Sequence, residues 1–151
     1  MSNTASTVSW ITRLPAVGIL GMAGFAKVSG DPGSVYLMQD MLGAPEVARY
    51  ALGAAELVLA IALLVPKTLP YASFAVMLMM LGAIGSHLFK LGISIEVPET
   101  APEGVAASIG GPSLFVMAIV VFFSALITAF LKRDTFPHRR CEPDRASPDP
   151  A

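Results

Sequence analysis

Four long apolar stretches constrain the fold of this chain more than any other feature. They cover residues 8–28, 46–66, 69–90 and 112–131. Each is roughly 20 residues long, which is the length that an α-helix needs to cross the hydrocarbon core of a bilayer. Because backbone polar groups must be satisfied inside a membrane, such stretches fold as helices. The sequence therefore predicts an all-α protein built as a four-transmembrane-helix bundle.

The composition supports this class and excludes several functions. Hydrophobic residues make up 54% of the chain and charged residues 14%, whereas soluble domains contain about 25% charged residues. The net charge of -1 gives no basic surface for nucleic acid, so we predict no nucleic-acid partner. The single cysteine, Cys141, excludes an internal disulfide, a CxxC pair and a cysteine-held iron–sulfur cluster. We expect no metal site and no cofactor held by this chain alone, and the sequence favours a non-enzymatic role.

The segments outside the spans have distinct characters. Residues 29–44 begin with turn-forming residues and continue with apolar residues at helical spacing, which predicts a short amphipathic helix lying along the membrane interface. Residues 91–111 form an acidic loop, and residues 1–7 form a polar segment. Residues 132–151 are basic at first and then proline-rich, so we expect a disordered tail.

The first span has a second interpretation. It also fits a secretory signal peptide, with Arg13 in the basic region and cleavage after Ala26. The sequence leaves open whether residues 1–26 are removed.

The distribution of lysine and arginine predicts the orientation. In a four-span topology both termini lie on one side, and the side with more basic residues is cytoplasmic. We therefore predict a multi-pass protein of the plasma (inner) membrane with cytoplasmic termini and an external acidic loop. The basic residues on the side of the termini are Arg13, Lys67, Lys132, Arg133, Arg139, Arg140 and Arg145, and those on the other side are Lys27, Arg49 and Lys90.

One carboxylate, Glu56, lies near the middle of the second span. A charge at such a depth costs roughly 2.5–3.5 kcal/mol, so Glu56 requires either a partner or a proton raised onto it by desolvation. If Gly18 and Glu56 are the span centres, Arg13 lies about 7 Å from the membrane midplane, at about 1.5 Å per residue. We predict a buried ion pair between Arg13 and Glu56, with the alternative that Arg13 extends to the inner interface.

Three basic side chains fall at a similar height near the outer face. Lys27, Arg49 and His87 are predicted to form an outer polar cluster, below which a small polar cavity opens outward with Glu56 at its floor. The alternatives are that Lys27 and Arg49 extend to the interface as anchors and that His87 lies beside a headgroup. Glycines on one helix face let a neighbouring helix approach closely. The predicted helix-packing glycines are Gly18, Gly21, Gly24, Gly53, Gly82 and Gly85.

Residues of the first three apolar stretches carry a resemblance to a known family. Arg13, the motif GMAGFAKVSG with Phe25 and Lys27, the motif LGAAELVLAIALLVP with Gly53 and Glu56, and then His87 are the residues concerned. Over residues 10–131 the chain resembles the DoxX-like family of small four-helix integral membrane proteins. The resemblance implies the fold. Relatives include subunits of thiosulfate:quinone oxidoreductase, components of redox-stress complexes and receptor chaperones, so it implies no single function.

Three functional hypotheses follow. The favoured one is a non-catalytic accessory or assembly partner that docks onto another membrane protein, or onto a second copy, through its glycine faces and acidic loop. The second is a membrane subunit of a quinone-linked oxidoreductase, in which Glu56 and His87 exchange protons with a quinone and another subunit carries the redox centre. The third is a proton-coupled small-molecule transporter, for which the sequence lacks evident inverted repeats.

Overall fold

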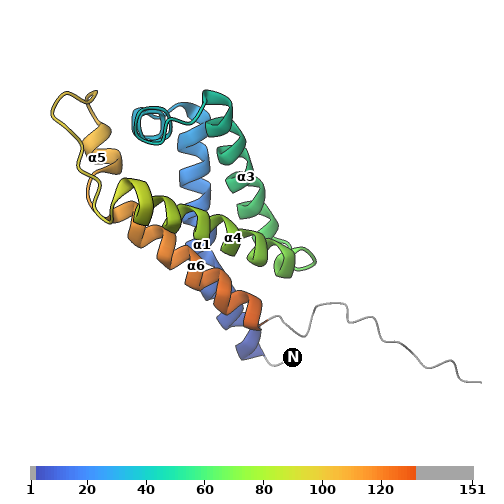
Figure 1. Cartoon of the computed structure of the whole chain (residues 1–151). Helices are drawn as coiled ribbons and strands as arrows, with labels where there is room; N and C mark the ends of the chain where they lie inside the picture. Colours follow the sequence, from blue (N-terminus) through green and yellow to red (C-terminus); the bar gives the residue numbers. More distant parts are fainter. Residues whose placement is uncertain (1–2, 132–151) are drawn as a thin grey trace, which may run out of the picture.

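The computed structural model describes residues 3–131, and four long helices form its body (Figure 1). Each contains a stretch long and apolar enough to cross a membrane, which confirms the predicted all-α, four-span fold. Residues 1–2 and 132–151 lie outside the described part, and they include Cys141 and the whole of the predicted tail. The four helices are α1 (Asn3–Ser29), α3 (Glu46–Leu64), α4 (Leu69–Ser86) and α6 (Ser113–Leu131).

The short helix predicted between the first two spans is present. It consists of α2 (Pro32–Val35) followed directly by η1 (Tyr36–Met41), whose turns are wider than those of an α-helix. Asp31 caps α2, since its carboxylate accepts a hydrogen bond from the Ser34 amide at 3.1 Å. Pro32 occupies the first position, where its missing N–H costs nothing.

The segment predicted as an acidic loop contains structure of its own. Helix α4 continues as a wider turn, η2 (His87–Leu91), and a short helix, α5 (Val105–Ile109), follows later in the loop. Ile95 and Gly111 exchange two backbone hydrogen bonds and close the base of the loop. The helix α5 was not predicted from the sequence.

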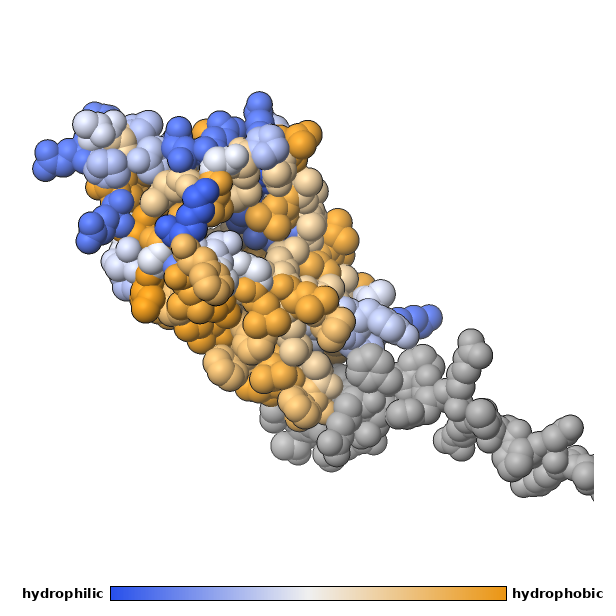
Figure 2. Space-filling view, in the orientation of Figure 1, coloured by the Kyte–Doolittle hydropathy of each residue, from blue (hydrophilic) through white to orange (hydrophobic). Residues whose placement is uncertain are grey.

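The long helices pack in a defined order. Helix α1 packs against both α3 and α6, and α6 packs against α4, whereas α3 and α4 make a smaller contact. The start of α1 and the end of α6 lie at one end of the bundle, and η1 and α5 lie at the other end (Figure 1). Hydrophilic residues gather at the end formed by the short helices, while the flank in view is largely hydrophobic (Figure 2). This distribution is the one expected of a protein surrounded by lipid.

Two buried apolar clusters lie at different heights in the bundle. The larger joins all four long helices and includes Leu20, Leu63, Val76 and Val121. The smaller consists of Ile95, Val105 and Ile109 beneath the loop that carries α5. Residues of both clusters line a cavity, and this part of the molecule contains the candidate site.

Candidate functional site

Helices α1 and α3 approach each other most closely at two glycines. A Cβ atom added at Gly24 would lie 2.8 Å from the carbonyl oxygen of Gly53, and one added at Gly53 would lie 3.0 Å from that of Gly24. Only glycine permits such close backbone contact between helices in a membrane. By contrast, no atom lies within 4 Å of the Cβ position at Gly18, Gly21, Gly82 and Gly85. Among the described residues, no side chain or neighbouring helix occupies the Cβ positions of these four glycines, and their role in helix packing stays a prediction.

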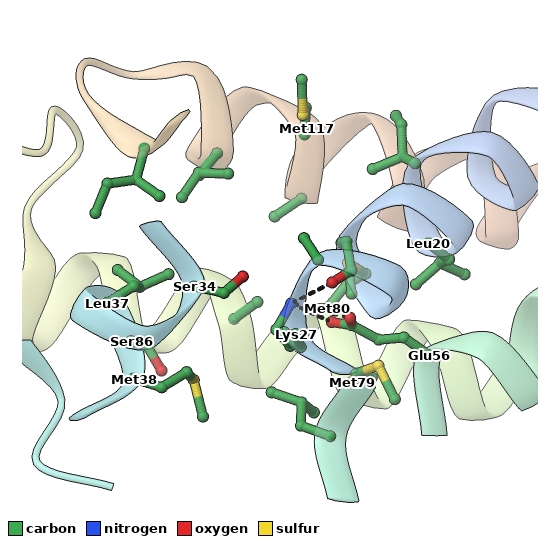
Figure 3. A pocket seen from close by; sticks show the side chains of 18 of the residues that line it. Leu20, Lys27, Ser34, Leu37, Met38, Glu56, Met79, Met80, Ser86 and Met117 are labelled. Carbon is green, nitrogen blue, oxygen red and sulfur yellow. Dashed lines mark hydrogen bonds and ion pairs between the residues drawn. The ribbon is translucent and has the colours of Figure 1, made fainter. Parts of the chain in front are cut away.

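Each glycine at this contact is followed three residues later by a charged residue. Lys27 and Glu56 therefore lie on the same helix faces as Gly24 and Gly53. The Lys27 Nζ atom donates hydrogen bonds to Glu56 Oε1 at 3.0 Å and to Oε2 at 2.9 Å (Figure 3). A Cβ at Gly53 would lie 2.8 Å from the Lys27 Cβ, and a Cβ at Gly24 would lie 3.1 Å from the Glu56 Cβ. Each glycine thus makes room for the charged side chain of the opposite helix.

The predicted pairing of Arg13 with Glu56 is wrong. Arg13 is buried, but its guanidinium donates to the Leu63 carbonyl at 3.3 Å and lies 3.7 Å from the centre of the Trp10 ring. Because α1 and α3 are antiparallel, their register places Arg13 beside Leu63, about 10 Å along the helix from Glu56 at about 1.5 Å per residue. Lys27, at the other end of α1, occupies the position beside Glu56.

The predicted outer cluster of Lys27, Arg49 and His87 is divided between two environments. Arg49 is buried and donates to the Lys27 backbone carbonyl and, at 3.4 Å, to the Glu46 carboxylate. The His87 Nδ1 atom lies 2.9 Å from the carbonyl oxygen of Gly92. Among residues 3–131, no hydrogen bond joins His87 to either basic residue. Neither Lys27 nor Arg49 extends to the surface, because each finds an oxygen acceptor inside the bundle.

A cavity of about 740 Å³ lies between the four long helices, with η1 and α5 at its polar end. The Lys27–Glu56 pair lines it, together with apolar side chains such as Leu20, Met80 and Met117 (Figure 3). His87 also lines the cavity. The prediction was a small polar cavity with Glu56 at its floor. A cavity lined by Glu56 is present, but its walls are mainly apolar, so the predicted polar character is wrong. The polar residues that line it are Lys27, Asp31, Ser34, Glu56, Ser86, His87, Ser108 and Ser113.

Comparison with protein families gives a match over residues 11–101, to the DoxX-like family. The chain belongs to this family. No curated protein and no solved structure gives a significant match. In this DoxX-like chain the matched region contains Arg13, Lys27, Glu56 and His87, and it ends before α5 and α6. The resemblance expected over residues 10–131 is thus found over a shorter range.

The cavity of this DoxX-like protein also extends to its apolar flank. Met22, Leu78 and Met117 line it, yet they remain 67%, 55% and 38% exposed. These side chains thus belong both to the cavity lining and to the exposed surface of the apolar spans. Among the described residues, no group of three or more His, Cys, Asp or Glu side chains could hold a metal ion. The arrangement is suited to binding an apolar molecule that carries a polar group.

The sequence did not reveal the pairing of Lys27 with Glu56 or the place of Asp31 and Ser108 in this site. The repeated pattern of a glycine followed three residues later by a charge, Gly24 with Lys27 and Gly53 with Glu56, is a signal that could have identified the ion pair. Asp31 carries no comparable signal. Its carboxylate accepts a hydrogen bond at 3.0 Å from the hydroxyl of a serine that is 77 residues distant in sequence, Ser108.

Proposed function

We propose that this DoxX-like membrane protein binds a lipophilic small molecule in the cavity between its helices and serves as an accessory subunit of a larger membrane assembly. The observation that carries the proposal is the cavity of about 740 Å³ with the buried Lys27–Glu56 pair in its mainly apolar wall. Ligand pockets in proteins typically measure about 300–1,000 Å³ and combine apolar walls with a few polar groups.

The energetics of the ion pair support a role in binding. A buried salt bridge contributes little net stability compared with apolar side chains of similar volume, because both ions lose their hydration. The Lys27–Glu56 pair is 13% and 7% exposed at its side chains, and it borders a cavity instead of filling it. A ligand that contacts these groups gives a reason for their presence that packing alone does not supply.

The quinone-linked alternative concerns the same cavity. Glu56 and His87 both line it, which is the arrangement that proton exchange with a bound quinone requires. Such a role needs a redox centre on another subunit. Both Glu56 oxygens accept hydrogen bonds from Lys27, so proton exchange would also require this pair to separate. We therefore propose binding as the function of this chain and place any electron transfer in a partner.

Two glycine faces support the accessory part of the proposal. Gly18 and Gly21 on α1, and Gly85 on α4, have no atom within 4 Å of their Cβ positions, so a helix of a partner could approach there. Replacing Gly21 with Leu should abolish co-purification of a membrane partner. The matched control is Ala54→Leu, at an exposed position on α3. Retention of the same partners by both variants would contradict this docking surface.

Ligand binding is tested by filling the cavity. Ala83 lines it, whereas Ala54 is exposed and lies outside it. The full chain is purified in mild detergent and its bound lipophilic molecules are extracted and identified by mass spectrometry. A compound enriched with the unchanged protein and with Ala54→Phe should be lost with Ala83→Phe. Ala26→Phe, at another lining position, provides a second variant if Ala83→Phe fails to fold. Equal recovery of every compound from all folded variants would refute the proposal.

A further inference from the structure

The cation in the cavity wall has no hydrogen-bond donor to spare. Among the described residues that line the cavity, Lys27 is the only lysine or arginine. An ammonium group has three N–H donors. The Lys27 Nζ atom bonds both oxygens of Glu56 and, at 3.4 Å, the carbonyl oxygen of Ala23. All three donors are therefore directed to protein oxygens.

The hydrogen-bond acceptors in the cavity wall, unlike the Lys27 donors, are only partly occupied. Each Glu56 oxygen accepts from Lys27 alone and retains a further lone pair. The His87 Nδ1 atom faces the carbonyl of Gly92, which can only accept, so Nδ1 carries the hydrogen. In the neutral ring Nε2 is then an acceptor. Glu56 and His87 thus offer acceptor sites to a ligand that brings donors.

Asp31 adds a negative charge that no basic side chain balances. Its Oδ2 atom accepts from the Ser34 amide at 3.1 Å and from the Ser108 hydroxyl at 3.0 Å. In residues 3–131 the ion pairs are Lys27–Glu56 and Arg49–Glu46, and neither includes Asp31. One lysine, one glutamate and one aspartate line the cavity, so its formal charge is -1 with neutral His87.

We infer that the ligand of this cavity is a lipophilic amine. This inference rests on the proposed function, since it names the chemical class that the same cavity takes. A protonated amine brings a positive charge and up to three donors, which match the unbalanced Asp31 and the free acceptors of Glu56 and His87. Its apolar body lies against the Leu20, Met80 and Met117 side of the cavity, with the ammonium toward Asp31. A carboxylate or an oxidised quinone brings only acceptors, and the occupied Lys27 does not serve them, so the Ser34 hydroxyl is left as a neutral donor without a compensating positive charge.

The test compares three probes that share one apolar body and differ in the head group. They are 4-phenylbutylamine, 4-phenylbutanol and 4-phenylbutanoate, which are cationic, neutral and anionic at pH 7. Binding to the full chain in nanodiscs is measured by calorimetry, with subtraction of the heat from empty nanodiscs. The amine should bind at least about tenfold more tightly than the other two, which is the factor expected from one charge-assisted hydrogen bond.

A pair of aspartate variants tests the position of the ammonium. Asp31→Asn should weaken amine binding about tenfold and leave alcohol binding unchanged, because one charge-assisted contact is lost. Asparagine remains a good cap for α2, so the fold is retained. Asp40→Asn is the matched control, since Asp40 is exposed on η1 and does not line the cavity. It should leave both affinities unchanged.

The outcomes separate this inference from the proposed function. If the alcohol or the acid binds as tightly as the amine, the amine class is wrong, although binding in the cavity stands. If Asp31→Asn weakens all three probes equally, Asp31 acts only on structure and the assignment of the head group fails. If no probe binds above the empty nanodisc and Ala83→Phe changes nothing, the proposed function fails as well.

Discussion

The contact between α1 and α3 predicts that alanine at Gly24 gives a less stable protein than alanine at Gly21, one turn earlier on the same helix. In Gly24→Ala the new methyl group would lie 2.8 Å from the Gly53 carbonyl oxygen and 2.9 Å from the Leu57 Cγ atom. The carbonyl belongs to a helix backbone and cannot rotate away. The helices must therefore separate, which also lengthens the hydrogen bonds between Lys27 and Glu56.

The size of the destabilisation follows from a comparison with Gly21→Ala. Nothing lies within 4 Å of the Cβ position that this substitution would fill. Alanine stabilises a helix interior by about 0.5–1 kcal/mol relative to glycine, and this gain applies to both variants. It cancels in their difference. What remains is the cost of overpacking at Gly24, about 1–3 kcal/mol. We expect Gly24→Ala to be less stable than Gly21→Ala by this amount.

Unfolding in mixed micelles of dodecyl maltoside and increasing dodecyl sulfate, followed by far-ultraviolet circular dichroism, measures the two free energies of unfolding. The same substitution on the same helix removes most effects of detergent and composition from the comparison. Equal stability of the two variants would refute the close glycine contact and, with it, the register that places Lys27 beside Glu56.

Two further predictions concern the ion pair and the orientation. Glu56→Gln leaves a buried ammonium without its counter-ion and should cost about 3–5 kcal/mol, whereas Lys27→Met combined with Glu56→Leu should recover most of this loss in the same unfolding assay. Equal losses in the single and double variants would contradict the pairing. For the orientation, Cys141 is replaced by serine and a single new cysteine is introduced by Glu99→Cys or by Lys67→Cys. In intact cells the Glu99→Cys variant should react with a membrane-impermeant maleimide and the Lys67→Cys variant should not. The reverse labelling would invert the predicted topology.

The sequence was sufficient for the architecture because the bilayer sets the length of each span. Four apolar stretches of suitable length predicted four helices, and the apolar residues at helical spacing after the turn at Asp31 and Pro32 predicted the short helix that follows the first span. The helix α5 was missed because its five residues, Val105–Ile109, are too few to show a period in the sequence.

The depth of Glu56 also indicated either a basic partner or a protonated carboxyl group, since an unpaired charge in hydrocarbon is costly. Which residue supplies that charge depends on the register between two antiparallel helices. Only the tertiary structure decided it, because the contact of Gly24 with Gly53 places Lys27, and not Arg13, beside the carboxylate. The estimate that paired Arg13 with Glu56 took Gly18 and Glu56 as the centres of their spans. Such an estimate gives the correct register only if every helix crosses the membrane symmetrically.

The cavity depended on tertiary structure in the same way. Its wall combines Asp31, Glu56, His87 and Ser108, which come from four separate segments and share no spacing in the sequence. Apolar periodicity shows which face of a helix is buried, but not whether the neighbouring helices fill the space beside it. Helix length and the need for a counter-charge are properties of a single segment in a membrane, whereas the pairing and the empty volume arise only when the segments pack together.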